Sequence, residues 1–199
     1  MRSLPVRARV IGLALVALSA CQLSYRGGAQ AVSAHALEPG WLRAAPTPVI
    51  TQRQPQDCGL AALAMVAGAW GRRWSVVEMA HQLRPTRRGL TLGALRDLAR
   101  ARDLDAYAIR GSHADLAHEL GAGRPVLLGL VLPYDRQRTL HHFEVAVAFD
   151  PATGTVITRD PATGQLRRRS RAVLEREWQP AGHATLVVVG DRALRQAAR

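Results

Sequence analysis

The 199-residue sequence contains no lysine. This absence excludes chemistries that need an ammonium side chain, namely the phosphate-binding lysine of a P-loop, a Schiff-base lysine and a Ser-Lys dyad. All 27 positive side chains are therefore arginines, which against 15 acidic side chains give a formal charge of +12. We expect no ATP to bind, and the positive charge needs another explanation.

The excess of arginine is also unaccompanied by any nucleic-acid-binding motif. Its densest cluster is Arg167-Arg168-Arg169 with Arg171. We find no zinc-finger spacing, no RNA-binding aromatic motif and no basic amphipathic helix beside it. Three further arginines lie within the first nine residues, and the rest are scattered. We interpret the arginines as an ordinary solvated surface and expect no nucleic-acid partner.

The chain is also poor in cysteine, with one at Cys21 and one at Cys58. Residues 1–9 are basic, and residues 10–17 form an apolar run too short to span a bilayer. Leu18-Ser19-Ala20-Cys21 follows and resembles the lipobox of bacterial lipoproteins, in which a signal peptidase cuts before the cysteine and the thiol is acylated. We therefore expect residues 1–20 to be a signal peptide and Cys21 to carry lipid.

A lipid on Cys21 removes it from disulfide chemistry and leaves Cys58 as a free thiol in an oxidising compartment. The expected location is the cell envelope of a bacterium, lipid-anchored and facing the periplasm. Gln22 is not the aspartate that is associated with inner-membrane retention, which favours the outer membrane. Residues 21–48 are small and polar with several Pro and Gly, and predict an extended tether on which Trp41 docks against the domain.

Cys58 lies at the start of an apolar segment, since no side chain from Leu60 to Ala69 is polar. A helix that is apolar all round belongs in the middle of a domain. At its amino end, unpaired N–H groups and the macrodipole favour the thiolate form of cysteine. Gln52, six residues upstream, offers an amide that could face an oxyanion. The alternative is that Cys58 is a small buried hydrophobe.

The pattern of the remaining chain predicts an α+β domain at residues 49–190, with a tail at 191–199. Helices come first and an antiparallel sheet follows, with the apolar residues 126–132 as a central strand. We expect further helices at 75–83, 91–99, 112–120 and 170–178, and strands at 106–110, 126–132, 143–149, 155–159, 165–169 and 184–189.

Seven histidines compete for the role of a general base. His142 is favoured because it opens a strand in which Phe143, Val145, Val147 and Phe149 share one face. His141 is expected to point to the opposite face. The others lie in helices or caps, or lack a surrounding motif, and are expected to be structural or solvent-facing: His81, His113, His118, His35 and His183.

The five residues Asp-Pro-Ala-Thr-Gly occur twice, at 150–154 and 160–164. Asp150 lies roughly 26 Å from His142 along one strand, at about 3.3 Å per residue, and is out of reach. If the chain turns over 150–154 so that Phe149 faces about Thr155, the returning strand brings Asp160 beside His142. We therefore expect Asp160 to contact His142 and Asp150 to serve only the turn.

Gln52, the run Asp57-Cys58-Gly59-Leu60-Ala61 and the run Leu63-Ala64-Met65 together resemble the active-site segment of the bacteriocin-processing (double-glycine leader) peptidases. These are papain-like cysteine peptidases, best known as amino-terminal domains of peptide-exporting ABC transporters. The resemblance extends from about Val49 to Val189. Two positions depart from the family pattern. Ala62 replaces a frequent second cysteine, and Glu144 replaces an apolar residue, which indicates a tuned pocket or a different substrate.

The resemblance implies a cysteine endopeptidase in which Cys58 attacks, His142 acts as base and acid, Asp160 orients His142, and Gln52 with the Cys58 N–H binds the oxyanion. It implies a peptide or protein substrate, such as a client of a secretion system, and no cofactor. Two alternatives remain open: acyl transfer or amide hydrolysis on a non-peptide substrate, and a non-catalytic peptide-binding lipoprotein. No metal is expected, because Cys58 and His142 form no zinc pattern.

Overall fold

The computed structural model describes residues 28–33, 39–87, 89–133 and 139–191. The predicted signal peptide, Cys21 and His35 lie outside the described residues. Among the residues described, no helix combines the length and apolar character that crossing a membrane requires.

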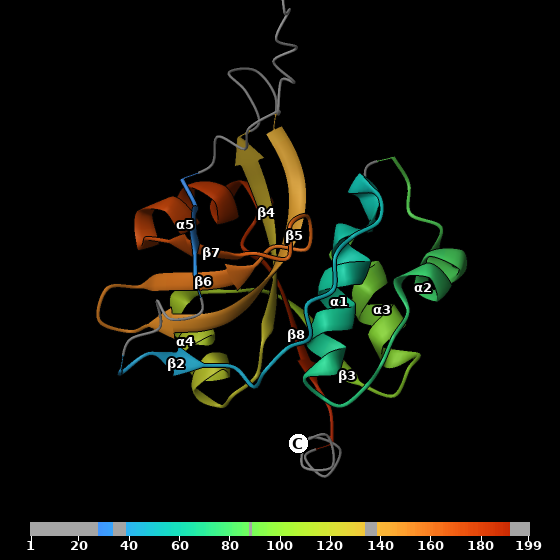
Figure 1. The fold of residues 1–199 in the computed structure, drawn as a ribbon, viewed down its shortest axis with the longest axis horizontal. Helices are drawn as coiled ribbons and strands as arrows, with labels where there is room; N and C mark the ends of the chain where they lie inside the picture. The colour runs from blue at the N-terminus through green and yellow to red at the C-terminus, as the bar shows by residue number, and fades with distance from the viewer. Residues whose placement is uncertain (1–27, 34–38, 88, 134–138, 192–199) are drawn as a thin grey trace, which may run out of the picture.

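Three helices lie on one side of the molecule: α1 (Cys58–Gly68), α2 (Val76–Leu83) and α3 (Leu92–Arg100) (Figure 1). As predicted, α1 starts at Cys58, and every residue from Cys58 to Ala67 is buried. It packs with Leu95 of α3 and with Val145 and Leu186 of the sheet in the larger hydrophobic core. A helix buried on all sides fixes its first residue firmly relative to the sheet.

The predicted helix starts are confirmed by their capping hydrogen bonds. The side chains of Ser75, Thr91, Ser112 and Ser170 each accept a backbone N–H from the residue three positions further on. The last two caps begin α4 (His113–Gly121) and α5 (Arg171–Trp178), which pack on the opposite side of the sheet from α1. Each cap satisfies a backbone donor that the first helical turn leaves unpaired.

The sheet has eight strands, and all of its pairs are antiparallel, as the α+β prediction requires. The main order is β1-β7-β6-β5-β4-β8-β3, and β2 also pairs with β5. The strands are β1 (Gln30–Val32), β2 (Leu42–Arg43), β3 (Asp105–Arg110), β4 (Val126–Pro133), β5 (Thr139–Asp150), β6 (Thr155–Arg159), β7 (Leu166–Arg169) and β8 (Ala184–Val189).

Strand β5 corrects two details of the prediction. It starts at Thr139, so that His141 and His142 lie within the strand and not at its opening. The expected single face is also wrong. Val145 packs in the core around α1, but Phe149 packs in a second core with Leu116 of α4 and Trp178 of α5. A β-bulge between Ala146 and Ala148 causes the change, because the extra residue reverses the alternation of side chains.

The described part of the predicted tether is attached to the domain. Strand β1 pairs with β7, and β2 pairs with β5 beside the bulge. The backbone N–H of Gly28 donates to Glu177 Oε1 of α5 at 3.1 Å. Trp41 packs against Leu166, as expected, and the guanidinium of Arg168 stacks on its ring. The sheet therefore gains two strands from a segment for which the sequence predicted none.

Candidate active site

Cys58 occupies the first position of α1, immediately after a short 3-10 turn formed by Pro55–Asp57. Its thiol is 4% exposed and forms no disulfide. The next residue, Gly59, allows α1 to approach the sheet, because a Cβ there would lie 3.0 Å from Leu95 and 3.1 Å from Phe143. The glycine after the cysteine thus places the thiol close to strand β5.

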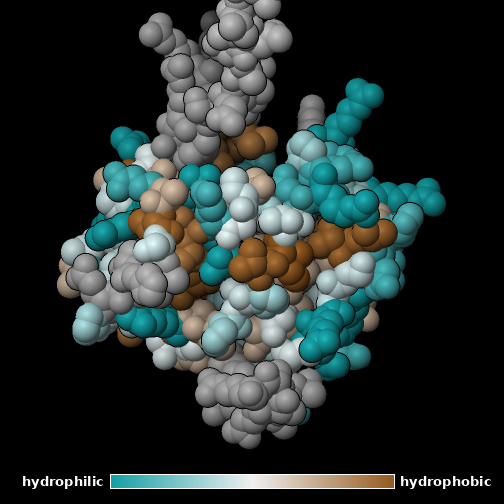
Figure 2. All heavy atoms as spheres, in the orientation of Figure 1, coloured by the Kyte–Doolittle hydropathy of each residue, from teal (hydrophilic) through white to brown (hydrophobic). Residues whose placement is uncertain are grey.

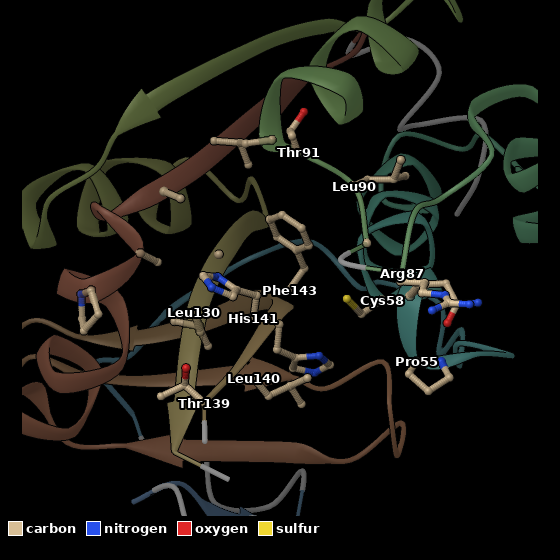
Figure 3. A pocket seen from close by; sticks show the side chains of 18 residues that line it. Pro55, Cys58, Arg87, Leu90, Thr91, Leu130, Thr139, Leu140, His141 and Phe143 are labelled. Carbon is tan, nitrogen blue, oxygen red and sulfur yellow. The ribbon is translucent and has the colours of Figure 1, made fainter. Parts of the chain in front are cut away.

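A cavity of about 620 Å³ opens beside the thiol. Figure 3 shows Pro55, Cys58 and Arg87 on one side of this cavity and the β5 residues Leu140 and His141 on the other. The volume lies within the range of ligand-binding pockets. On the face of the molecule shown in Figure 2, hydrophobic residues form a band across an otherwise mostly hydrophilic surface.

His142 connects Cys58 to a carboxylate. Its Nε2 lies 2.9 Å from Oδ1 of Asp160, which leaves Nδ1 for the hydrogen bond with Cys58. Burial acts to lower the pKa of His142, but the hydrogen bonds to Asp160 and Cys58, with the charges of Glu144 and Cys58, raise it to about 10. The imidazole is therefore held in its protonated form over the whole neutral range.

Asp160 is itself fixed in place by the turn that it starts. Its carboxylate accepts hydrogen bonds from the N–H of Ala162 at 2.8 Å and the hydroxyl of Thr163 at 3.1 Å, and Arg167 Nη2 lies 3.4 Å from Oδ2. Burial acts to raise the pKa of Asp160, but the His142 imidazole and the turn donors lower it to about 2. Asp160 is an oriented anion at any physiological pH.

The duplicated segment behaves as the hairpin predicts. Asp150 accepts from the N–H of Ala152 and the hydroxyl of Thr153, so its carboxylate is used by the turn. The expected contact between His142 and Asp160 is present. Two chemically identical segments therefore have different surroundings because the hairpin delivers only the second one to His142.

The bulge in β5 sets the register that makes this contact. Next to the turn, Asp150 pairs with Thr155 and Phe149 with Val156, one residue away from the expected pairing. Continued without a bulge, that register would place Asp160 opposite Val145, which faces the α1 core. With the bulge, Val145 pairs with Arg159. Asp160 therefore turns to the side that His142 and Glu144 share.

Gln52 lies beside the same turn. Its backbone N–H donates to the carbonyl of Pro161 at 2.9 Å. Its side-chain Oε1 is buried without a hydrogen-bond partner among the described residues. An unpaired buried polar atom lowers the free energy of unfolding by about 1–3 kcal/mol. The Gln52 side chain is therefore not explained by a contribution to stability. The structure brings Gln52 to the Asp160 turn and leaves its side-chain oxygen uncommitted among the described residues.

The described histidines other than His142 have the structural or exposed surroundings that the sequence indicated. His118 is 75% exposed, whereas His113 and His183 both contact Glu175 and Trp178. His141 is exposed and lines the cavity. Among these side chains, His142 is the one buried against a thiol.

The interpretation of the arginine cluster as an ordinary solvated surface is wrong for Arg169, which is fully buried. Its guanidinium binds Glu144 and Glu177. These contacts explain the unusual Glu144, which faces this ion cluster. One signal of this cluster could be read in the sequence, an acidic residue inside an apolar strand. The partner could not be predicted, because Glu144 and Arg169 lie 25 residues apart.

His142, Glu144 and Asp160 are the described His, Cys, Asp and Glu residues that converge as metal ligands would, with ligand atoms within 4.8 Å of one another. Their oxygen atoms already accept hydrogen bonds from Arg169, Thr163 and the N–H of Ala162. A bound metal would need these lone pairs and would bring the cation close to a guanidinium group. The donor set therefore fits a hydrogen-bonded cluster better than a metal site.

A buried helix that begins with a thiol and faces a His–Asp pair on an antiparallel sheet defines the papain-like class of cysteine peptidase folds. Comparison with protein families matches residues 46–188 to the Peptidase C39 family, and the chain belongs to this family of cysteine peptidases. No curated protein sequence matches the chain.

Solved structures show the same fold. The peptidase domain of Streptococcus ComA, a bifunctional ABC transporter, matches with a TM-score of 0.58 at 18% identity, covering 74% of this chain and 99% of that one. A double-glycine-motif protease from an AMS/PCAT transporter matches with a TM-score of 0.59 at 20% sequence identity. The match covers 75% of this chain and 95% of that protease. A protein described as a C39-like peptidase from Bacillus anthracis matches with a TM-score of 0.60 at 17% sequence identity. The match covers 76% of this chain and 98% of that protein.

Proposed function

We propose that this chain hydrolyses a peptide bond of an exported or secreted polypeptide, with Cys58 as nucleophile, His142 as general acid and base, and Asp160 as the residue that orients His142. The observation that carries the proposal is the 2.9 Å contact of His142 Nε2 with Asp160, because it leaves the other ring nitrogen for Cys58. A thiolate, an imidazolium and an orienting carboxylate are the groups that cysteine peptidases use.

In the acylation step, the Cys58 sulfur attacks the carbonyl carbon of the scissile peptide bond. The carbonyl oxygen becomes an oxyanion, which receives hydrogen bonds from the Cys58 backbone N–H and the Gln52 side-chain amide. As the C–N bond breaks, protonated His142 donates its proton to the leaving amine. The product is a thioester on Cys58 and a free amine.

In the deacylation step, His142 is now neutral and accepts a proton from water. The hydroxide attacks the thioester carbonyl, and collapse of the second oxyanion releases the acid and regenerates the thiolate–imidazolium pair. Asp160 stays ionised throughout, since its pKa of about 2 is far below neutral pH. No cofactor enters either step.

The cavity beside Cys58, with a volume of about 620 Å³, is large enough to hold a segment of a polypeptide. The double-glycine-motif protease that resembles this chain was crystallised in complex with its leader peptide. We propose that the substrate of this chain likewise presents glycine or alanine at the cleavage site.

Cleavage should be detectable with synthetic 20-residue peptides that carry Gly-Gly, Ala-Ala or Leu-Leu before one scissile bond. Purified protein is expected to cleave the peptides with small residues at least about tenfold faster than the Leu-Leu peptide, since a pocket discriminates by about 1–3 kcal/mol for each methylene that differs. Mass spectrometry of the products identifies the bond, and Cys58→Ala protein serves as the blank. Cleavage that survives in the blank would contradict the assignment of the nucleophile.

We further propose that the mature chain is lipid-anchored through Cys21 in the bacterial cell envelope and faces the periplasm. The basic start, short apolar run and lipobox-like residues support this proposal. Mass spectrometry of the mature amino terminus is expected to find an acylated Cys21, and Cys21→Ala should move the protein from the membrane to the soluble fraction. A soluble mature wild-type protein that begins at another residue would refute the anchor.

A further inference from the structure

Arg169 on β7 is fully buried between two carboxylates that come from different elements. Its Nη1 and Nη2 bind the two oxygens of Glu144 on β5 at 2.7 and 2.9 Å, and its Nε binds Glu177 Oε2 on α5 at 2.6 Å. The hydroxyl oxygen of Thr158 on β6 also accepts a hydrogen bond from Nη1 of Arg169. The cluster thus connects β5, β6 and β7, which are consecutive in the sheet, to α5 (Figure 1).

This ion cluster lies directly beside the proposed active site. Glu144 follows His142 by two residues, so the two side chains lie on the same side of β5. Oxygen atoms of Glu144 and Asp160 and a ring nitrogen of His142 all lie within 4.8 Å of one another. Two buried carboxylates at this separation repel each other strongly unless cations lie between them.

Two buried carboxylates, Glu144 and Asp160, lie beside the ring of His142. The ring Nε2 contacts Asp160 Oδ1 at 2.9 Å, and protonation of the ring adds a positive charge next to both carboxylates. Because like charges repel in a buried site and an opposite charge relieves that repulsion, the two carboxylates favour the protonated ring. Among the described residues, the other titratable or charged groups that face His142 include Cys58 of α1 and, in the same cavity, His141 and Arg87.

We propose that Glu144, held by Arg169 and Glu177, is a positioning residue that keeps the protonated imidazole of His142 seated against Asp160. This inference rests on the proposed function, in which His142 must donate a proton. Although burial acts in the opposite direction, the charge of Glu144 contributes to the raised pKa of His142. A buried ion pair by itself is weak evidence for stability, because desolvation offsets its attraction. Because the Glu144–Arg169 ion pair lies beside His142, we assign it a role in positioning that ring.

The test follows the titration of His142 by NMR of its ring Cε1–H signal. All variants carry Cys58→Ala, so that the imidazole titrates without the coupled thiol. Glu144→Gln keeps the shape and removes the negative charge, so the midpoint of His142 is expected to fall by about one unit or more, a tenfold or greater loss of proton affinity. Glu177→Gln is the matched control, since it removes the same charge from the far side of Arg169. Its shift should be less than half as large.

A second variant should shift the titration midpoint of His142 in the opposite direction. Arg169→Gln combined with Glu177→Gln removes one positive and one negative charge and leaves Glu144 with His142 as its nearest cation. The midpoint of His142 should then rise, and this variant decides the question if Glu144→Gln does not fold. An unchanged midpoint in the folded variants, or equal shifts in Glu144→Gln and Glu177→Gln, would overturn the proposal.

A second readout separates this role from a structural one. Glu144→Gln should lower the titration midpoint of His142 whether or not it lowers the melting temperature of the protein. A purely structural role for Glu144 predicts a lower melting temperature with an unchanged midpoint. The NMR titration needs no substrate. A protein that shows the predicted shifts but cleaves no peptide would therefore refute the proposed function and leave the role of Glu144 intact.

Discussion

Asp160→Asn is expected to lower peptide turnover by up to about 10⁴-fold, the loss found when the orienting carboxylate of a Ser-His-Asp triad becomes an amide. The amide keeps the shape of Asp160 but loses the charge that holds His142 protonated, and it can present an N–H donor to Nε2. The reason for so large an effect is that both orientation and protonation of the ring depend on this one contact.

The matched control for this variant is Asp150→Asn. Both positions start the same five-residue sequence, and both carboxylates accept hydrogen bonds from their own turn. Asp150→Asn should therefore reproduce the cost to the turn, with turnover within about twofold of the wild type and at most about 1 kcal/mol lost in the free energy of unfolding. Steady-state cleavage of the Gly-Gly peptide and thermal melting give both values. Equal losses of turnover in the two variants would refute the role assigned to Asp160.

Cys58 is expected to react quickly with iodoacetamide near pH 6, where a free thiol is almost entirely protonated. The protonated imidazole of His142 is the cause, because a positive charge beside the sulfur stabilises the thiolate. His142→Ala removes this charge and should slow alkylation at pH 6 by more than about 10²-fold, given the roughly 2.5 pH units that separate pH 6 from the ionisation of an ordinary thiol.

Two controls separate this effect from simple exposure. Cys58→Ser should show no labelling, which proves that Cys58 is the site. His141→Ala changes the neighbouring imidazole, which lines the same cavity but is exposed, and should leave the rate nearly unchanged. A wild-type rate that rises only above about pH 8 and does not depend on His142 would favour the non-catalytic binding protein.

The parts of the structure that follow local rules could be predicted from the sequence. The apolar run after Cys58 predicts a buried helix, the four Ser and Thr residues predict the helix starts, and the repeated Asp-Pro-Ala-Thr-Gly predicts a hairpin that returns to His142. Each of these patterns lies within a few residues of the feature that it determines. The α+β arrangement follows from their order along the chain.

The parts that depend on distant contacts could not be predicted in this way. The bulge at Ala146 and Ala148 inserts one residue into an otherwise regular alternation, and no Gly or Pro marks it. Strands β1 and β2 have three and two residues, too few for a periodic pattern. The burial of Arg169 depends on Glu144 and Glu177 meeting in space, although the sequence places it in a run of arginines that looks solvent-exposed.

The attachment of Gly28 to Glu177 also limits where the enzyme can work. If Cys21 is acylated as proposed, only residues 22–27 connect the lipid to the folded domain, and these six residues with their flanking bonds extend to at most about 25 Å at roughly 3.5 Å per residue. That reach is less than the thickness of the hydrocarbon core of a bilayer, about 30 Å. The domain then stays within one protein diameter of the lipid surface. A polypeptide emerging from the membrane would meet the enzyme at a high effective concentration, while one free in the periplasm would meet it rarely.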